Sequence, residues 1–483
     1  MQEIDITTIT KRSIHGVFAL VSRTFLIQVV MQLVSFFLTI YLLPAEYGVF
    51  YIVSAAIAFL GYFSDIGLAA ALIQKKEPLT KDDLRTTFTI QQGLVIVVSI
   101  IALLFSDQIG RFYSLDGSGK ILYQALILAF FLSSLKTIPS ILLERELKFQ
   151  KLVIPEIVEA FAFSITVLTM VIMGFGVTSF TVAVVLRGFL GLITMYIVAP
   201  WKPEIGFSKP TAKRLLSFGL PFQANSILAL LKDQLLVIYL GKALPLTQVG
   251  YIGVAQKLAY TPLRLFMDNI IRITFPSFSR LTGTDYLGKA IEKTLFGICV
   301  FIFPATAGMV LVMPDFIKVF PKYEKWEPVL VSLGFFAANA ALSSISTPLT
   351  NALNAIGKIK VTLYLMIFWT LATWISIPIC ISLFGFNGVS IASFIISLSL
   401  FAVIFIAKRY ISFSVLPVIT PPLIATVVMS VFIYFLGRGL ITSLPMLIIV
   451  MIVGGGVYGA CLFIIAKSQI LSDLALIKEN LRK

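Results

Sequence analysis

The sequence of 483 residues is poor in charge and contains one histidine. Only 13% of its residues are charged, about half the share of a typical soluble domain, whereas 58% are hydrophobic. The single histidine, His15, precedes the first apolar run and leaves none for a metal site or a proton relay in the apolar part. The three cysteines, Cys299, Cys380 and Cys461, lie far apart inside apolar runs. We therefore expect buried small side chains rather than a disulfide or a metal site.

Long polar segments are missing as well. The connections between apolar runs reach roughly 20 residues at most, which leaves no room for a soluble catalytic domain or a nucleotide-binding loop. Membrane-bound polymerases and glycosyltransferases need such segments, so we expect a protein that is not an enzyme and has no catalytic residues. Residues 1–15 are polar and no cleavage site follows them, so the first apolar run is expected to be a retained span.

Apolar runs long enough to cross a membrane recur from end to end. The mean hydropathy is +0.99, and about 20 apolar residues cross a hydrocarbon core of ~30 Å. The sequence therefore predicts an all-α polytopic membrane protein. With turn residues as boundaries, fourteen transmembrane helices are predicted at residues 17–43, 47–73, 88–105, 121–143, 153–174, 177–200, 214–241, 247–279, 294–313, 328–351, 361–384, 386–407, 413–437 and 441–466.

The distribution of Lys and Arg predicts the orientation. Twenty-four of them lie in the N-terminus, every second connection and the C-terminus. The opposite connections hold only Arg111, Lys120, Lys242, Lys318, Lys322, Lys325 and Arg438. Because cytoplasmic segments carry the excess of basic residues, both termini are predicted to be cytoplasmic. This bias also accounts for most of the net charge of +15, so no nucleic-acid partner is expected.

One sequence pattern, expected to form a hairpin between two spans, occurs twice. Residues 40–52 read IYLLPAEYGVFYI and residues 238–252 read IYLGKALPLTQVGYI. Six predicted spans separate the copies, an even number, so both have the same orientation and indicate a parallel repeat. We predict a six-helix N-lobe at 1–200, a linker at 201–213, a six-helix C-lobe at 214–407, and two further helices with a cytoplasmic tail at 408–483. The two lobes are expected to enclose a central cavity. The alternative is that Tyr, Gly and Pro simply recur at membrane-interface turns.

Six segments in a fixed order carry a family resemblance: LLPAEYGVF at 42–50, SDIGLAAALIQ at 64–74, ERELKFQKL at 144–152, LLKDQLLVIYLG at 230–241, FPSFSRL at 275–281 and NALNAIGK at 351–358. In these the chain resembles Wzx-type polysaccharide flippases, the polysaccharide transporter branch of the multidrug/oligosaccharidyl-lipid/polysaccharide exporter superfamily. The resemblance implies twelve core helices in two lobes, often with two more. It also implies flipping of undecaprenyl-diphosphate-linked oligosaccharide units across the bacterial inner membrane.

Seven basic residues fall within the predicted spans: Arg23, Lys136, Arg187, Lys232, Lys257, Arg264 and Arg272. Each costs at least about 2.5–3.5 kcal/mol in the hydrocarbon core and is expected to face water or a partner. On span 247–279, Lys257, Arg264, Asp268 and Arg272 share an arc of about 80° at 100° per residue. The alternative for part of this stripe is an ion pair of Asp268 with the arginines four residues away.

A diphosphate ligand explains the surplus of cations. Arginine side chains match phosphate oxygens in bidentate geometry. We therefore predict that Lys257, Arg264 and Arg272 hold the diphosphate head group, with Arg187 and Arg23 as helpers. The alternative for Arg23 is that it reaches to the cytoplasmic surface. Lys136, near the end of its span, is more simply a structural residue.

Uncharged polar and aromatic residues in the spans suit sugar hydroxyl groups and ring faces. The predicted sugar contacts are Tyr51, Tyr62, Tyr260, Gln28, Gln32 and Gln223. Asp65, Asp233 and Asp268 are candidates for ion pairing or for coupling to a proton or Na⁺. No metal site and no cofactor are expected.

These features predict alternating access. The head group enters from the cytoplasmic leaflet while the lipid tail stays in the bilayer, and the lobes then rock to expose the cavity outward. A peptidoglycan-precursor flippase remains an alternative. So does a cation-coupled multidrug antiporter, although that needs an acidic cavity and these spans hold seven basic residues against five acidic ones. Expected partners are the lipid-linked oligosaccharide, membrane lipids, and the polysaccharide polymerase and chain-length machinery. The protein is expected to act as a monomer.

Overall fold

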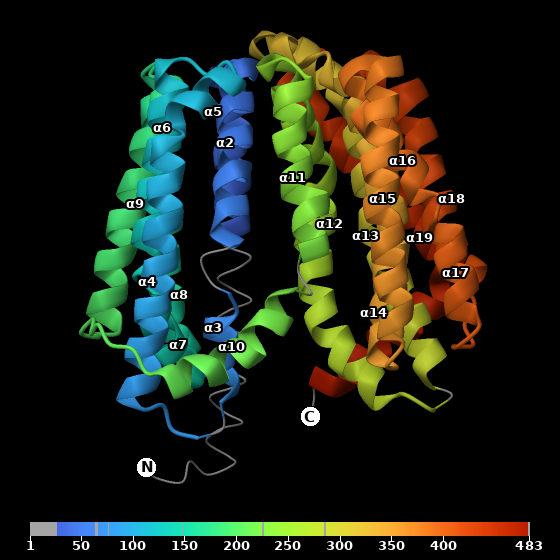
Figure 1. The fold of residues 1–483 in the computed structure, drawn as a ribbon. Helices are drawn as coiled ribbons and strands as arrows, with labels where there is room; N and C mark the ends of the chain where they lie inside the picture. The colour runs from blue at the N-terminus through green and yellow to red at the C-terminus, as the bar shows by residue number, and fades with distance from the viewer. Residues whose placement is uncertain are drawn as a thin grey trace. The chain divides into compact units, whose positions relative to one another are not determined.

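A computed structural model describes residues 27–481 apart from 63–65, 76, 147, 225–226 and 285. Within these residues the secondary structure is helical, with no strand (Figure 1). The chain divides into two compact units, residues 1–250 and 251–483. The predicted all-α membrane fold is confirmed, because ten helices of the described part are long and apolar enough to cross a membrane.

The first unit holds eleven described helices, of which the first is Ile27–Tyr41. The others are α2 (Pro44–Tyr62), α3 (Leu68–Gln74), α4 (Lys81–Leu104), α5 (Ser106–Phe112), α6 (Gly117–Ser134), α7 (Thr137–Arg145), α8 (Phe149–Ile172), α9 (Val177–Val198), α10 (Lys209–Ala224) and α11 (Ile227–Ala243). In this unit α9 packs between α6 and α8, and α2 packs on α6, α9 and α11. Phe50 of α2 stacks on Phe180 of α9, with ring centroids 4.0 Å apart. Buried aromatic rings of this kind add to the helix–helix packing of the unit.

The second unit begins within α12 (Leu246–Arg280). It continues with α13 (Tyr286–Val319), the 3-10 turn η1 (Pro321–Trp326), α14 (Val329–Ala355), α15 (Ile359–Phe384), η2 (Gly385–Asn387), α16 (Gly388–Ser397), α17 (Leu400–Lys408), α18 (Leu416–Phe432), η3 (Ile433–Gly437), η4 (Arg438–Leu440) and α19 (Leu444–Leu481). Helix α13 is central, since it packs against α14, α18 and α19 (Figure 1). Its buried Ile291, Leu295 and Cys299 belong to an apolar cluster that also includes residues of α14, α18 and α19.

Several predicted spans differ from the helices in their limits. The helix expected at 88–105 begins earlier, at Lys81, because Thr80 and Asp83 form a capping box there. The spans expected at 121–143 and 386–407 are each divided, into α6 with α7 and α16 with α17. The span expected at 214–241 corresponds to α10 and α11, on either side of residues 225–226. The exact number of fourteen transmembrane helices stays a prediction.

The repeated hairpin is a structural pair. A Cβ atom built on Gly48 would overlap the carbonyl oxygen of Leu246, and one built on Gly250 would overlap the carbonyl oxygen of Pro44. Leu246 precedes Gly250 by four residues, as Pro44 precedes Gly48. Each copy of the hairpin therefore contacts the other through equivalent positions. Such reciprocity is the mark of a two-fold relationship. Glycine is required at both positions because the backbones approach too closely for a side chain.

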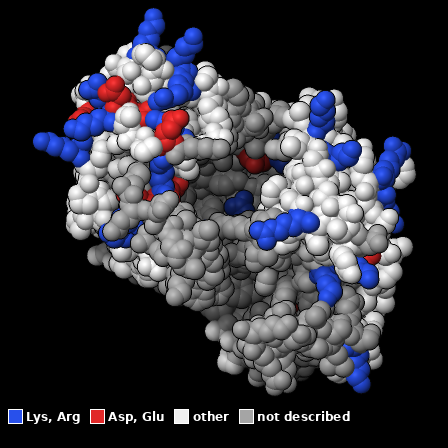
Figure 2. All heavy atoms as spheres, turned by 90° about the horizontal axis from the view of Figure 1, so that it is seen from below, with Lys and Arg blue, Asp and Glu red and all other residues white. Residues whose placement is uncertain are grey.

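The opposite end of the first unit is held by a buried carboxylate. Asp83 has no exposed side-chain surface and accepts from Lys75 Nζ at 2.6 Å and from Arg214 at 2.5 Å. It also caps α4 by accepting from the backbone N–H of Thr80 at 2.8 Å. Because Arg214 belongs to α10, this one carboxylate joins the α3–α4 connection to α10. Figure 2 views this end and shows basic side chains gathered around carboxylates over the first unit.

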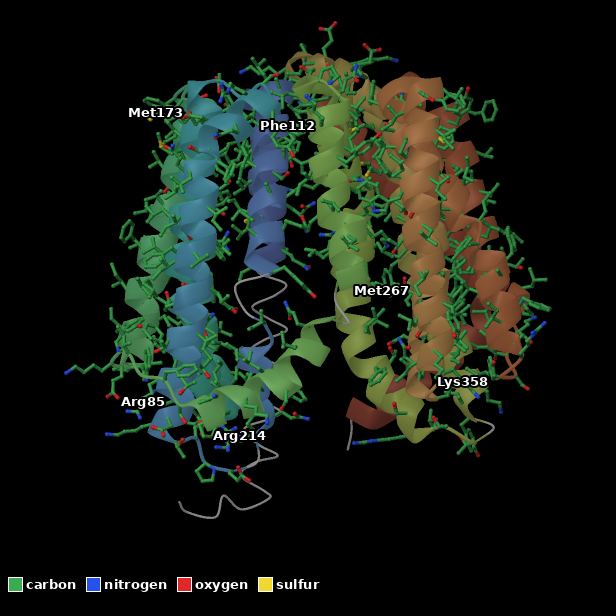
Figure 3. The ribbon with its side chains drawn as sticks, in the orientation of Figure 1. Arg85, Phe112, Met173, Arg214, Met267 and Lys358 are labelled. Carbon is green, nitrogen blue, oxygen red and sulfur yellow. The ribbon has the colours of Figure 1, made fainter. Side chains whose placement is uncertain are left out.

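Arg145 holds the same connection from another side. Its guanidinium donates to the carbonyl oxygens of Leu72 and Lys75, both at 2.6 Å, and to that of Glu77 at 2.9 Å. Arg145 ends α7 within the segment ERELKFQKL, so part of the family resemblance serves to fix the chain between α3 and α4. Arg85 and Arg214 are labelled at this end in Figure 3.

Candidate functional site

The cation-bearing face of α12 lies opposite its packing face. Phe266 lies about 180° from Lys257 around the helix, and it stacks on Phe301 of α13 with ring centroids 4.7 Å apart. Met267, labelled in Figure 3, is buried with Ile298 of α13. The apolar side of α12 is thus covered by α13, and the side that carries Lys257 is turned away from it.

Lys257 is half-buried and Arg264 is exposed. Among the residues whose side chains are described, no carboxylate lies within 4.0 Å of either cation. The side chains of Asp268 and Arg272 are outside the described part, so the predicted pairing of Asp268 with the arginines stays a prediction. The described portion of the stripe carries two positive charges on a helix that the sequence predicts to span the membrane.

Tyr260 borders this face and contacts α14. Its ring lies 5.9 Å from that of Phe336, at an interplanar angle of 56°. Further along, Asn351 of α14 and Thr274 of α12 are joined by a bond of 3.4 Å. The predicted sugar-stacking tyrosine therefore lies at the contact line between α12 and α14.

Two of the predicted sugar contacts meet in the first unit. The hydroxyl of Tyr62 donates to the backbone oxygen of Gln223, and the Gln223 amide donates to the backbone oxygen of Tyr62 at 2.9 Å. The Tyr62 hydroxyl and the Gln223 side-chain amide are thus both engaged in hydrogen bonds that join α2 to α10. Gln28, Gln32 and Tyr51 are each half-buried. The Oε1 atom of Gln28 is buried and has no hydrogen-bond partner among the described groups.

Arg187 belongs to a triad that the sequence did not indicate. Lys136 donates to one carboxylate oxygen of Glu159, and Arg187 Nε lies 3.4 Å from the other. A Cβ on Gly191 would overlap the Glu159 side chain, so this glycine provides the space for it. The interpretation of Lys136 as a structural residue agrees with this pairing. One carboxylate for two cations leaves a surplus positive charge, and the Arg187 side chain is 50% exposed.

The remaining predicted residues are not brought into these clusters. Asp233 lies on α11 with its side chain 64% exposed, 3.9 Å from Lys232. Arg23 and Asp65 lie outside the described residues. The triad and the α12 stripe belong to different units, so their predicted convergence on one ligand stays a prediction. In the described part of the chain, no cluster of three His, Cys, Asp or Glu could hold a metal ion.

The second unit has a second polar face, which the sequence predictions did not include. Between residues 339 and 354 of α14, every position in an arc of about 100° is Asn, Ser or Thr. These residues, here called the α14 polar stripe, are Asn339, Ser343, Ser346, Thr347, Thr350 and Asn354. The available signal was their spacing of three and four residues. These residues are uncharged, so the cost of placing charge in an apolar segment did not single them out.

The comparisons with known proteins agree on family and fold. Residues 37–330 match the model of a family described as polysaccharide biosynthesis protein. Over 336 residues the chain is 27% identical to the lipopolysaccharide biosynthesis protein WzxC of Escherichia coli (strain K12), covering 67% of this chain and 66% of that protein, just under two thirds of its length. Over 240 residues it is 19% identical to the succinoglycan biosynthesis transport protein ExoT of Rhizobium meliloti (strain 1021), covering 49% of this chain and 48% of that protein.

The fold is similar to that of a solved transporter. The lipid II flippase MurJ, in an inward closed conformation, superposes with a TM-score of 0.74 at 17% identity, covering 93% of this chain and 99% of that one. The names of the relatives agree with the expectation of a transport protein rather than an enzyme. The fold supports a multi-pass bacterial membrane protein. The predicted resemblance to Wzx-type flippases is confirmed, and the chain belongs to the polysaccharide biosynthesis protein family.

Proposed function

We propose that this protein is a flippase for undecaprenyl-diphosphate-linked oligosaccharide units. It moves them from the cytoplasmic to the outer leaflet of the bacterial cytoplasmic membrane, for export of a surface polysaccharide. The family match and the names of the relatives support polysaccharide transport. The observation that carries the choice of ligand is the cation face of α12, where Lys257 and Arg264 have no carboxylate partner among the described side chains.

The charge balance favours an anionic head group. Two cations at membrane depth cost about 2.5–3.5 kcal/mol each on insertion scales unless something compensates them. A diphosphate carries about two negative charges and accepts charge-assisted hydrogen bonds from both side chains. The surplus charge at Arg187 provides a further site of the same sign in the first unit. A multidrug antiporter would need carboxylates to attract cationic drugs, and these sites carry the opposite charge.

Alternating access is the transport mechanism we propose. The lobes at 1–200 and 214–407 rock against each other, so that the cavity opens alternately to the two sides of the membrane. Both termini stay in the cytoplasm, and the lipid tail stays in the bilayer. The membrane potential, or a proton or Na⁺ bound at Asp65, Asp233 or Asp268, resets the cycle. The protein acts as a monomer and delivers its cargo to the polymerase and chain-length machinery.

The test replaces Lys257 and Arg264 together by glutamine in the native host. A charge-assisted hydrogen bond is worth about 1.5–3 kcal/mol, so export of surface polysaccharide should fall at least about tenfold. Mass spectrometry of extracted lipids should show the diphosphate-linked glycan accumulating. The matched control is Lys360→Gln, which removes an exposed cation at the start of α15 and should leave export unchanged.

Three results separate the alternatives. Normal export by the double variant would refute the role of α12. Accumulation of the peptidoglycan precursor, in place of a surface-polysaccharide intermediate, would favour the peptidoglycan-precursor flippase. Absence of any accumulated diphosphate-linked species after deletion of the whole protein would overturn the proposed function.

A further inference from the structure

We infer that the α14 polar stripe binds the sugar part of the same ligand, next to the cations of α12 that hold its diphosphate. This inference rests on the proposed function and assigns one helix face to each half of the head group. It makes the stripe a specificity-determining element. Ser343 lies near the centre of its arc and Thr347 at the edge nearest α12. The glycan is its occupant.

The two helices run parallel and side by side. Tyr260 meets Phe336, and Thr274 meets Asn351, so contacts advance in the same direction along both chains. The intervals of 14 and 15 residues correspond to about 21 and 22 Å of helix, which keeps the two in register. By this register Arg264 is level with the beginning of the stripe, near Asn339. The stripe then continues along α14 for about 22 Å.

Both polar faces lie on the same side of the contact line. Viewed along the axis of α12, Arg264 and Lys257 are rotated by about 60–80° from the side that contacts α14. The sense of this rotation is the one in which successive residues turn about the helix axis. Around α14, the centre of the stripe lies about 60° from the side that contacts α12, in the opposite sense. In two parallel right-handed helices these two rotations turn both faces toward the same side. The cations and the hydroxyl and amide groups therefore border one continuous polar surface of the second unit.

The chemistry of the stripe suits an uncharged, hydroxyl-rich ligand. Ser346 and Thr350 donate to carbonyl oxygens of their own helix, at 3.4 and 2.9 Å, which leaves each hydroxyl oxygen free to accept. The hydroxyl of Thr347 forms no hydrogen bond with another described residue, and its backbone oxygen accepts from Thr350. All six side chains are half-buried, so they are accessible and not packed into the core. Hydroxyl groups that face lipid have no hydrogen-bond partners in the hydrocarbon. Hydroxyl groups that face a sugar can form hydrogen bonds with it.

Part of the stripe also has a structural role, and this guides the choice of variants. Asn339 donates to the carbonyl oxygen of Ser393 on α16 at 2.5 Å, and Asn354 accepts from Thr362 on α15 at 2.5 Å. These two ends hold α14 to its neighbours. Ser343 and Thr347 contact no other helix through a hydrogen bond in the described part of the chain. They can therefore be changed without breaking a link between helices.

The experiment measures binding of two probes to the full-length protein in nanodiscs. One probe is undecaprenyl diphosphate without sugar, and the other is the lipid-linked repeat unit extracted from the host. The wild-type protein should bind the glycosylated probe more tightly. In the double variant Ser343→Ala with Thr347→Val this preference should fall roughly tenfold, because two hydrogen bonds are lost. Affinity for the probe without sugar should change less than about threefold.

Two further variants test the position and the chemistry. Ser344→Ala changes the neighbouring residue, whose buried hydroxyl donates to Ala341 O on another face, and it should keep the preference. Thr347→Ser retains the hydroxyl and should keep it as well. An unchanged preference in the double variant, an equal loss for both probes, or the absence of any preference in the wild type would overturn the inference. Failure of the wild type to bind undecaprenyl diphosphate would instead refute the proposed function.

Discussion

Asp83 tests whether a buried ionic network holds the α3–α4 connection. We predict that Asp83→Asn loosens this connection locally while the rest of the protein stays folded. Asparagine keeps the shape of the side chain and one acceptor for the capping N–H of Thr80. It removes the negative charge that faces Lys75 at 2.6 Å and Arg214 at 2.5 Å. The Lys75 side chain, only 10% exposed, is then left as a cation without its closest partner.

The structure indicates the size of the effect. Breaking a buried ion pair by removing one partner costs about 3–5 kcal/mol. The lower end applies here, because the Arg214 side chain is 53% exposed and water compensates it. A local destabilisation of about 3 kcal/mol raises the open population about 160-fold, at 1.36 kcal/mol per factor of ten. The neighbouring Asp82 provides the matched control, since it pairs with Arg85 at 2.7 Å and both side chains are more than 40% exposed.

The assay is trypsin cleavage after Lys76, a bond whose lysine and following residue are the same in every variant, in the detergent-purified protein. When opening is fast relative to cleavage, the cleavage rate follows the open population. We expect an increase on the order of 100-fold for Asp83→Asn. For Asp82→Asn we expect less than about fivefold, because an exposed pair contributes ~0–1 kcal/mol. Adding Lys75→Met to Asp83→Asn should reverse much of the increase, since it removes the uncompensated cation.

Equal cleavage rates in the Asp83 and Asp82 variants would refute the reasoning. So would a failure of Lys75→Met to reduce the rate in the Asp83→Asn background. Either result would mean that burial of the carboxylate does not control the opening of this connection.

Two further predictions concern the repeat and the coupling. Gly250→Ala should lower the melting temperature, because its Cβ meets the carbonyl oxygen of Pro44 and overpacking costs about 1–3 kcal/mol. Gly93→Ala, where no atom lies within 4 Å of the added Cβ, should not lower it, and equal melting of the two variants would contradict the steric argument. Replacing Asp65, Asp233 and Asp268 singly by asparagine should reduce polysaccharide export in at least one variant. Full export in all three would exclude carboxylate coupling.

The candidate site was partly readable from the sequence. Lys257 and Arg264 stood out because charged side chains in an apolar segment are costly and therefore rare. Their common face followed from the helical period alone. The α14 polar stripe has the same periodicity, but Ser, Thr and Asn are tolerated in transmembrane helices and gave no comparable signal. Its proposed role depends on the contact between α12 and α14, which the tertiary structure provides.

Ion pairs between residues far apart in the chain could not be predicted from the sequence. Glu159 pairs with Lys136 and Arg187, 23 and 28 residues away, because the start of α7 packs together with α8 and α9. Asp83 meets Arg214 across 131 residues. No local pattern encodes such pairs, since many arrangements of the helices would satisfy the same hydropathy.

Composition and periodicity determined that this chain is a helical membrane protein, and they predict an internal repeat and cations within the spans. They suffice because the bilayer imposes helix length, backbone pairing and the cost of charge on each segment separately. Tertiary structure decided which charges are compensated, which faces meet, and that the two hairpins pack glycine against glycine. Those outcomes depend on side-chain volumes and contacts between helices, which only the packed structure specifies.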